Sequence, residues 1–297
     1  RREARTGGVV SYSAAVKVAA PAVVNIFTTQ KVKQMNHPLL SDPVFREFFG
    51  NQVPQQPQNE NSLGSGVIVR ADGYILTNNH VIAQAEHIVV ALHDGRRAEA
   101  KVIGTDPDTD LAVIKIELDK LPVLPFKLSG NEVGDVVLAI GNPFGVGQTV
   151  TQGIISATGR SDLGINTYED FIQTDAAINP GNSGGALIDV AGNLIGVNTA
   201  IFSQSGGSLG IGFAIPAKIC QQVLNSILKD GRVVRGWLGI SLIPNTVEDD
   251  VLAAKPIGVI VADVLRDGPA DVAGVKRGDK IIQVNNEQIT SASHLIN

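Results

Sequence analysis

Short apolar runs separated by turn residues dominate the chain from Leu63 to Ile215. Stretches such as GVIV, YILT, IVVAL, DLAVIKIE, DVVLAIG and GIGFAI have the length of β-strands, and the turns ADGY, HDGR and VAGN are typical of hairpins. Two packed antiparallel barrels account for this many short strands. The pattern therefore predicts a mainly β domain with a double β-barrel.

A helical pattern follows at residues 216–231, PAKICQQVLNSILKDG. Pro216 suits the first helical position, apolar residues recur on one face, and Gly231 suits the position after the last turn. Strand-and-turn patterning returns at RGWLGISL, residues 235–242, and a second, smaller domain begins near Arg232. We therefore expect two domains, residues 1–231 and residues 232–297.

The segment before these strands has two parts. Residues 12–29 run from a short helical pattern into a β-branched strand at Val23–Thr29. Residues 34–62 are rich in Pro, Gln and Asn but carry several Leu and Phe side chains. We expect this second part to be a long, mobile loop with an apolar patch.

Composition and charge exclude several classes of protein. Hydrophobic residues make up 43% of the 297 residues and aromatic residues only 4%, and the 32 glycines suit short strands and tight turns. The net charge is −5 and no run of five like charges occurs, so nucleic acid is not expected as a partner. The sequence has no metal-ligand motif, phosphate loop or dinucleotide motif, so no cofactor is expected. The single cysteine, Cys220, lies in the helical pattern, where we expect it to pack in the core.

One serine is surrounded by residues with almost no side chain, in NPGNSGGAL at residues 179–187. A tight turn explains the glycines, but so does a nucleophile, Ser183, with open backbone around it for a substrate carbonyl. His80 ends an apolar strand in GYILTNNHVI, a position from which a side chain can enter a cleft. Asp110 opens the apolar strand DLAVIKI, so its carboxylate needs a buried partner such as an imidazole N–H. The order His80, Asp110, Ser183 is that of the chymotrypsin triad.

In these three residues and in the motifs around them, the sequence resembles the HtrA family of serine proteases across nearly its whole length. The matching motifs are GSGVIV (64–69), GYILTNNHV (73–81), TDLAVIKI (109–116), GNPFG (141–145), GIISATGR (153–160), FIQTDAAINPGNSGGAL (171–187) and GIGFAIP (210–216). The resemblance implies a chymotrypsin-like protease domain in which Ser183 is the nucleophile, His80 the base, and Asp110 the residue that orients His80. It also implies an oxyanion hole made by the backbone amides of Gly181 and Ser183, with Asn182 in the turn between them. Because Gly181 has no Cβ, its peptide plane can rotate at low cost, and the resemblance implies that the hole switches between ordered and unordered states; which state dominates at rest stays open.

The expected substrate preference is for small apolar residues. Ala177 lies six residues before Ser183, at the position that forms the bottom of the specificity pocket in chymotrypsin-type enzymes. Because it is not acidic, Arg or Lys at the cleavage site is disfavoured. By resemblance, Ile178, Ile201 and Phe202 line a shallow apolar pocket. The alternative is that these three side chains belong only to the core.

Residues 234–242, VRGWLGISL, resemble the carboxylate-binding loop and following strand of a PDZ domain. The residues expected to hold the C-terminal carboxylate of an activating peptide are Gly236, Trp237, Leu238 and Gly239. An ordinary turn before a strand is the alternative. Residues 235–297 number only 63, so we expect this smaller α+β domain to be incomplete at its C-terminal side.

Arg160, in GRSDLGINTYED, matches the arginine of a regulatory loop in the family, and a solvated loop charge is the alternative. The GWLG form of the PDZ loop favours the DegS-type stress sensors, which respond to C-termini of misfolded outer-membrane proteins and cut an anti-sigma factor. The long loop at residues 34–62 favours the DegQ-type housekeeping proteases. The choice between the two branches stays open.

The family resemblance implies a homotrimer in the bacterial periplasm that acts on unfolded or misfolded proteins. The sequence has no apolar stretch of 18 residues, and because it begins at Arg1 rather than at a methionine, it leaves open whether a signal or an inner-membrane anchor precedes it. Two other functions are considered: a chaperone or peptide-binding scaffold with little proteolysis, and an esterase. The complete set His80, Asp110 and Ser183 argues against a scaffold, and the serine-last order argues against an α/β-hydrolase.

Overall fold

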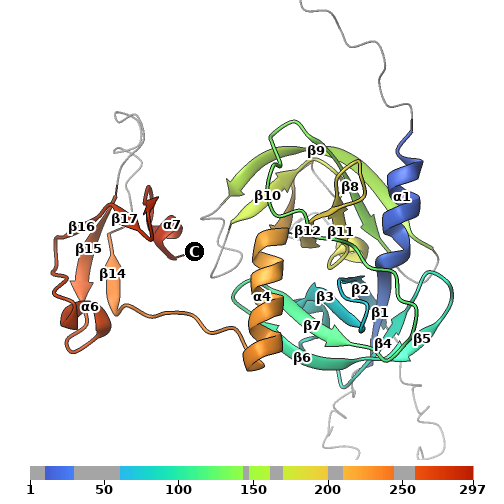
Figure 1. Ribbon diagram of the computed structural model, residues 1–297, viewed down its shortest axis with the longest axis horizontal. Helices are drawn as coiled ribbons and strands as arrows, with labels where there is room; N and C mark the ends of the chain where they lie inside the picture. The colour runs from blue at the N-terminus through green and yellow to red at the C-terminus, as the bar shows by residue number, and fades with distance from the viewer. Residues whose placement is uncertain are drawn as a thin grey trace, which may run out of the picture.

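The computed structural model has a mainly β fold, as the sequence predicts (Figure 1). The residues that it describes are 11–29, 61–142, 147–160, 170–199, 210–243 and 258–296. Ile201, Phe202 and nearly all of the predicted loop at residues 34–62 lie outside them. The last two residues of that predicted loop, Asn61 and Ser62, already belong to a strand, which pairs with Thr28 and Phe27.

Seven antiparallel strands form the first sheet, in the order β5-β4-β1-β2-β3-β7-β6. They are β1 (Val23–Thr29), β2 (Asn61–Ile68), β3 (Tyr74–Asn78), β4 (His87–Ala91), β5 (Arg97–Glu99), β6 (Lys101–Asp106) and β7 (Leu111–Lys115). The predicted strand at Val23–Thr29 is confirmed as β1. The two outer strands, β5 and β6, are separated by Ala100 alone, so the chain itself brings the two edges of the sheet together.

Six strands close the second sheet into a barrel, in the order β10-β13-β12-β11-β8-β9. They are β8 (Val136–Gly141), β9 (Thr149–Arg160), β10 (Phe171–Thr174), β11 (Ala186–Ile188), β12 (Leu194–Thr199) and β13 (Gly212–Pro216). The long strand β9 pairs with β8 along one part and with β10 along the other, which closes the ring. Its interior is filled by small and branched side chains, among them Val137, Ala139, Ile155, Leu187 and Ile195. The predicted β-barrel architecture is therefore found, with the closed ladder in the second sheet.

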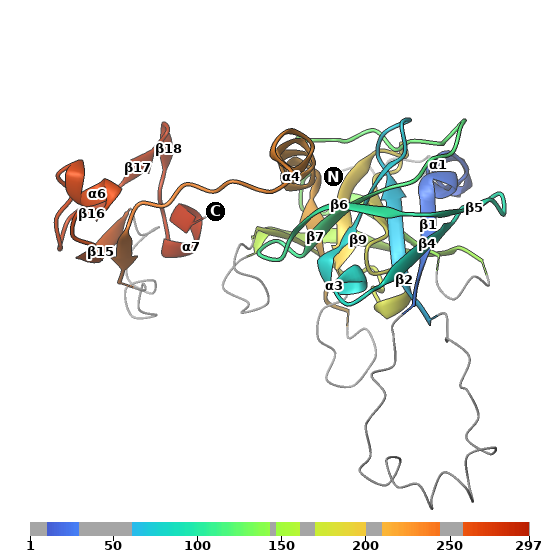
Figure 2. The same cartoon turned by 90° about the horizontal axis from the view of Figure 1, so that it is seen from below.

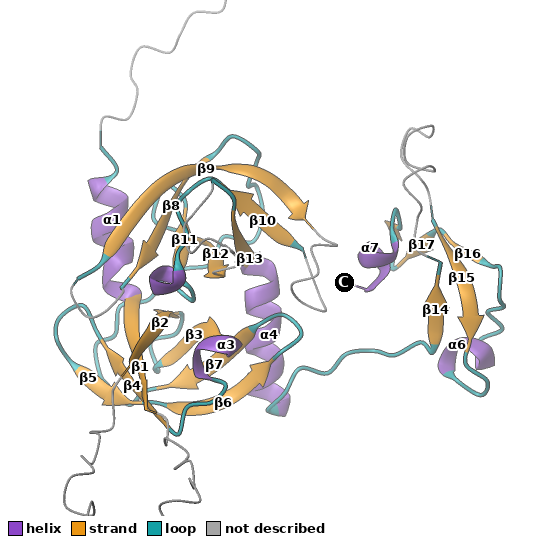
Figure 3. Ribbon diagram, turned by 180° about the vertical axis from the view of Figure 1, so that it is seen from behind, coloured by secondary structure: helices purple, strands orange, loops and turns teal. Residues whose placement is uncertain are grey.

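The predicted helix is α4 (Ala217–Asp230). Pro216 precedes it, and Gly231 ends it with φ 70° while donating its N–H to the carbonyl of Ile227 at 2.8 Å. The helix contacts strands of both sheets, and it lies on the opposite side of them from α1 (Ser13–Ala19) (Figure 3). Cys220 is fully buried, and burial raises the pKa of its thiol to about 12. Cys220 belongs to the main apolar core, which confirms its expected packing role, and a buried thiol of this kind is a poor nucleophile.

The chain then runs from α4 into a smaller group of elements (Figure 2). It contains a three-stranded sheet in the order β14-β15-β16 and a two-stranded β17-β18 hairpin. The elements are β14 (Ile240–Leu242), β15 (Val259–Val264), α6 (Pro269–Val272), β16 (Lys280–Ile281), β17 (Gln283–Val284), β18 (Glu287–Gln288) and α7 (Ala292–Ile296). Val259, Val261, Ala270 and Ile289 are its buried apolar side chains. This mixture of strands and short helices agrees with the predicted α+β character.

Candidate active site

Two facing strand ends bring His80 and Asp110 together. The ladder between β3 and β7 pairs Asn78 with Leu111, so the residues just beyond this pair become neighbours although 30 positions separate them in sequence. His80 lies on the short helix α3 (Asn79–Ile82), and Asp110 lies directly before β7. The carbonyl of Asp110 accepts the N–H of Asn79 at 3.0 Å, which continues the ladder by one bond.

The carboxylate of Asp110 is bonded to His80 at two points. One oxygen accepts the backbone N–H of His80 at 2.9 Å, and the other lies 2.6 Å from the ring atom Nδ1. The Asp110 side chain is only 14% exposed, whereas the His80 ring is 46% exposed. Asp110 has φ 59°, an unusual conformation for a residue with a Cβ. A shielded carboxylate on Nδ1 leaves the other ring nitrogen, Nε2, available as a base.

Ser183 lies across from this pair, at the end of the helical turn η4 (Pro180–Asn182). Its Oγ is 3.3 Å from Nε2 of His80 and 2.7 Å from Oδ1 of Asn78. Ser183 is 1% exposed, and its carbonyl accepts the N–H of Ser65 from β2 at 2.9 Å. The structure thus brings together all three residues that the sequence predicts as catalytic.

The turn before Ser183 is held by its own two asparagines. Asn179 donates its N–H to the side chain of Asn182 at 2.8 Å, and Asn182 donates its N–H to the carbonyl of Asn179 at 3.0 Å. The side-chain amide of Asn182 also donates to the carbonyl of Ala177 at 3.1 Å. These bonds explain the Asn-Pro-Gly-Asn sequence as a closed turn directly before the predicted nucleophile.

Ser65 ties the same turn to the first sheet. Its hydroxyl donates to the carbonyl of Gly181 at 2.9 Å and accepts the N–H of Asn142 at 2.9 Å. Ser65 is fully buried, so water does not compete for these bonds. Gly184 has φ 82°, and a Cβ there would come within 2.2 Å of the Ser65 carbonyl oxygen. Glycine after Ser183 is therefore required both by conformation and by space.

Asn78 and Ser65 are the two site residues that the sequence interpretation missed. Asn78 is a polar residue at the end of an apolar strand, two positions before the candidate base. Ser65 stands between two glycines in GSGVIV. A polar residue expected to be fully buried must have a partner, and this is the signal that could have pointed to either residue.

The predicted specificity residues are partly described. Ala177 is half-buried, and its carbonyl accepts the hydroxyl of Thr151 at 2.8 Å as well as the Asn182 amide. Ile178 is 9% exposed and packs in the core of the second barrel, where its Cδ1 would lie 3.0 Å from a Cβ at Gly212. A pocket role for Ile178 stays a prediction.

Arg160 is exposed at the end of β9, where its Nε donates to the side chain of Gln173 at 3.1 Å. In the predicted carboxylate loop, Trp237 is 62% and Leu238 50% exposed, while the Gly239 carbonyl accepts the N–H of Leu265 at 2.7 Å. The regulatory role of Arg160 and the peptide-binding role of this loop stay predictions.

A buried ion pair connects the segment after α4 to the loop that carries Asp110. The guanidinium of Arg235 donates to both carboxylate oxygens of Asp106, at 2.7 and 2.6 Å. The Asp106 side chain is 3% exposed and also accepts the hydroxyl of Thr109. Asp108 lies 3.3 Å from the same guanidinium. Asp110 therefore follows a turn in which Arg235, far away in the sequence, balances the buried charge of Asp106.

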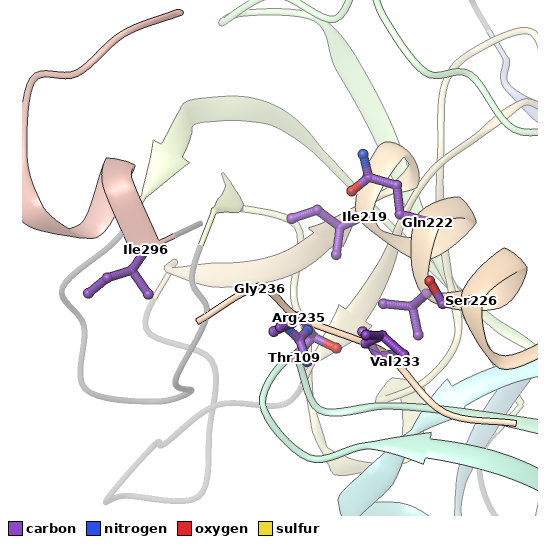
Figure 4. A pocket seen from close by; sticks show the side chains of 10 residues that line it. Thr109, Ile219, Gln222, Ser226, Val233, Arg235, Gly236 and Ile296 are labelled. Carbon is purple, nitrogen blue, oxygen red and sulfur yellow. The ribbon is translucent and has the colours of Figure 1, made fainter. Parts of the chain in front are cut away.

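A cavity of about 300 Å³ lies beside this ion pair (Figure 4). Its lining residues are Thr109, Ile219, Gln222, Val223, Ser226, Val233, Val234, Arg235, Gly236 and Ile296. None of the three triad residues lines it, so it is not the catalytic cleft. Within the described residues there is no group of three His, Cys, Asp or Glu side chains placed to hold a metal ion. Nor does that part of the chain include a helix with the length and apolar character needed to cross a membrane.

A mainly β fold that carries histidine, aspartate and serine in this geometry and chain order defines the chymotrypsin-like class of serine peptidases. Residues 64–197 match the family described as "Trypsin-like peptidase domain", and residues 226–296 match the family described as "PDZ domain".

Solved structures are similar over nearly the whole chain. "HtrA-type protease AlgW with decapeptide" is 57% identical, covers 97% of this chain and 89% of that chain, and has a TM-score of 0.79. The serine endoprotease from Yersinia pestis is 43% identical, covers 97% of this chain and 88% of that chain, and has a TM-score of 0.69. This chain therefore belongs to the HtrA family of proteases.

Curated relatives extend beyond the aligned region. "Probable periplasmic serine endoprotease DegP-like" of Ectopseudomonas mendocina (strain ymp) is 46% identical over 96% of this chain and 64% of that protein. The protein of the same name from Chlamydia pneumoniae is 47% identical over 95% of this chain and 62% of that protein. The chain thus spans less than two thirds of the length of these relatives.

Proposed function

We propose that this chain is a serine endopeptidase that hydrolyses peptide bonds with Ser183 as nucleophile. The observation that carries the proposal is the continuous set of contacts from Asp110 to His80 at 2.6 Å and from His80 to Ser183 at 3.3 Å. Contacts of this kind allow a hydroxyl to lose its proton to an imidazole that a carboxylate holds in place.

The reaction follows from these contacts. His80 Nε2 takes the hydroxyl proton while Ser183 Oγ bonds to the substrate carbonyl carbon, and the carbonyl oxygen becomes an oxyanion. The oxyanion is stabilised by the backbone amides of Gly181 and Ser183, a donor pair of which one member typically contributes about 10²- to 10³-fold to the rate. His80 then gives the proton to the leaving amine, and water hydrolyses the acyl-enzyme by the same steps.

The substrates are unfolded or misfolded proteins cut after small apolar residues. Ala177 at the bottom of the predicted pocket offers no charge for Arg or Lys, and the neighbouring Ile178 is apolar. The PDZ loop at residues 236–239 binds the C-terminal carboxylate of an activating peptide, a regulation supported by the solved relatives that hold a decapeptide or a tripeptide. Peptide binding is coupled to the turn before Ser183, with Arg160 as a connecting residue.

The setting is the bacterial periplasm, in protein quality control or the envelope stress response. The curated relatives are named periplasmic endoproteases, which supports this location. A homotrimer formed near α1 and an anti-sigma factor as a regulatory substrate belong to the same proposal. Val18 on α1 is 64% exposed, an apolar side chain suited to such a contact.

The test is turnover of an unfolded protein by the wild-type chain and by Ser183→Ala. Each is assayed with a peptide that ends in a free apolar carboxylate and with the same peptide amidated. Cleavage that depends on Ser183 and rises only with the free carboxylate supports both parts of the proposal. Cleavage at the same rate with and without the peptide overturns the PDZ regulation. If the chain suppresses aggregation of the substrate without cleaving it, the chaperone alternative is favoured.

A further inference from the structure

The hydroxyl of Ser183 lies closer to Asn78 than to His80. Its Oγ is 2.7 Å from Oδ1 of Asn78, the usual length of an O–H···O hydrogen bond. The distance from the same oxygen to Nε2 of His80 is 3.3 Å, at the long end for such a bond. A hydroxyl has one proton, so it donates to one acceptor at a time. The shorter contact assigns that proton to Asn78.

The orientation of the Asn78 amide follows from its second contact. Its Nδ2 donates to the carbonyl of Asp110 at 3.2 Å, which leaves Oδ1 facing Ser183. Reversing the amide would set its oxygen against the Asp110 carbonyl oxygen, two acceptors without a proton between them. Asn78 is fully buried, so this bond lies away from water.

We propose that Asn78 is a positioning residue that holds the Ser183 proton away from His80 while no substrate is bound. The inference rests on the proposed function of Ser183 as nucleophile. Before His80 can act as base, the hydroxyl must rotate from Asn78 Oδ1 to His80 Nε2, and the hydrogen bond to Asn78 is lost. Asn78 therefore adds to the barrier of acylation and keeps the unoccupied enzyme less reactive.

Removing the Asn78 side chain leaves the acid in place. The Asp110 carbonyl keeps the backbone N–H of Asn79 as its donor at 3.0 Å, and the Asp110 carboxylate keeps both of its bonds to His80. The variant Asn78→Ala therefore removes the competing acceptor without removing any contact between His80 and Asp110.

The first test is the second-order rate at which a fluorophosphonate probe labels Ser183, with the activating peptide present. In this reaction Ser183 Oγ bonds to phosphorus, fluoride leaves, and the hydroxyl proton passes to His80. We expect Asn78→Ala to react about two- to tenfold faster than wild type, the range that corresponds to the loss of one hydrogen bond. The matched control is Asn225→Ala, at an exposed position of α4 away from the site, whose rate should equal that of wild type.

A folded Asn78→Ala variant that reacts no faster than wild type overturns the inference. If the wild-type chain itself is not labelled at Ser183, the proposed function fails instead, so the two failures are distinguishable.

A second test needs no substitution at Asn78. The ¹⁵N resonance of His80 Nε2 is compared between the wild-type chain and Ser183→Ala. If the hydroxyl donates to Asn78, deleting it leaves the Nε2 resonance unchanged. A clear displacement of that resonance would mean that Ser183 donates to His80 at rest, and the inference would be wrong.

Discussion

The acid–base pair and the nucleophile of this site are held in different ways. His80 and Asp110 extend the β3–β7 ladder, a run of backbone hydrogen bonds between two buried strands. Ser183 instead follows the turn η4, which depends on side-chain bonds from Asn182 and Ser65. A ladder bond is supported by its neighbours, whereas the turn combines one backbone bond, from Asn182 N–H to the Asn179 carbonyl, with bonds that each depend on a single side chain. The proposed nucleophile is therefore held in part by side-chain bonds that a single substitution can remove.

Backbone conformation sharpens the contrast. Asp110 adopts φ 59° although it has a side chain, and the surrounding ladder and its bonds to His80 keep it there. After Ser183, the positive φ falls on Gly184, where it carries no comparable steric cost. The positive φ is therefore sterically unfavourable at Asp110, beside the ladder, but not at Gly184, after the turn.

The largest effect is expected on the ladder side, for Asp110→Asn. An amide in place of the carboxylate can present its NH₂ group to Nδ1 of His80 and favour the wrong tautomer, so kcat should fall about 10⁴-fold. The kcat on a peptide substrate, together with circular dichroism as a check of folding, measures this effect. The neighbouring Asp108→Asn is the control and should stay close to wild type. An equal loss in both variants would contradict a specific role for Asp110.

An intermediate effect is expected on the turn side, for Ser65→Ala. The Gly181 carbonyl and the Asn142 N–H both lose their partner, so the turn that carries the proposed oxyanion donors loosens. We expect kcat to fall about 10²-fold, with a smaller change in KM, because the transition state depends most on this geometry. Steady-state kinetics separates the two constants, and the exposed Ser241→Ala serves as control. A changed KM with an unchanged kcat would speak against this role.

The smallest effect on activity is expected for Arg235→Ala, because this residue acts on Asp110 only through the preceding turn. The Asp106 carboxylate would stay buried without its guanidinium, and the free energy of unfolding should fall by about 3 kcal/mol. Activity of the folded enzyme should fall only about two- to tenfold. Thermal unfolding and kcat/KM measure the two effects, with the exposed neighbour Arg232→Ala as control. Unchanged stability would show that the ion pair contributes little.

Much of this fold could be predicted from local patterns. The strand at Val23–Thr29 and the helix after Pro216 appear where the sequence indicates them, because the strand is rich in β-branched residues and the helix buries one apolar face. The sequence predicted that β-barrels form, but not which strands pair to close the second sheet. Which strands meet depends on pairs far apart in sequence, such as β9 with β10 and β10 with β13, and no local pattern encodes such a pairing.

The sequence by itself determined the chemical groups of the site: a histidine, an aspartate and a serine followed by two glycines, in a diagnostic order. Only the tertiary structure decided that their atoms meet at 2.6 and 3.3 Å, because the contacts join strands and turns from separate parts of the chain. It alone also revealed Asn78 and Ser65, whose roles depend on burial beside Ser183 and Gly181. A polar side chain gains such a role from the partner that folding places beside it, and the partner is not visible in the neighbouring sequence.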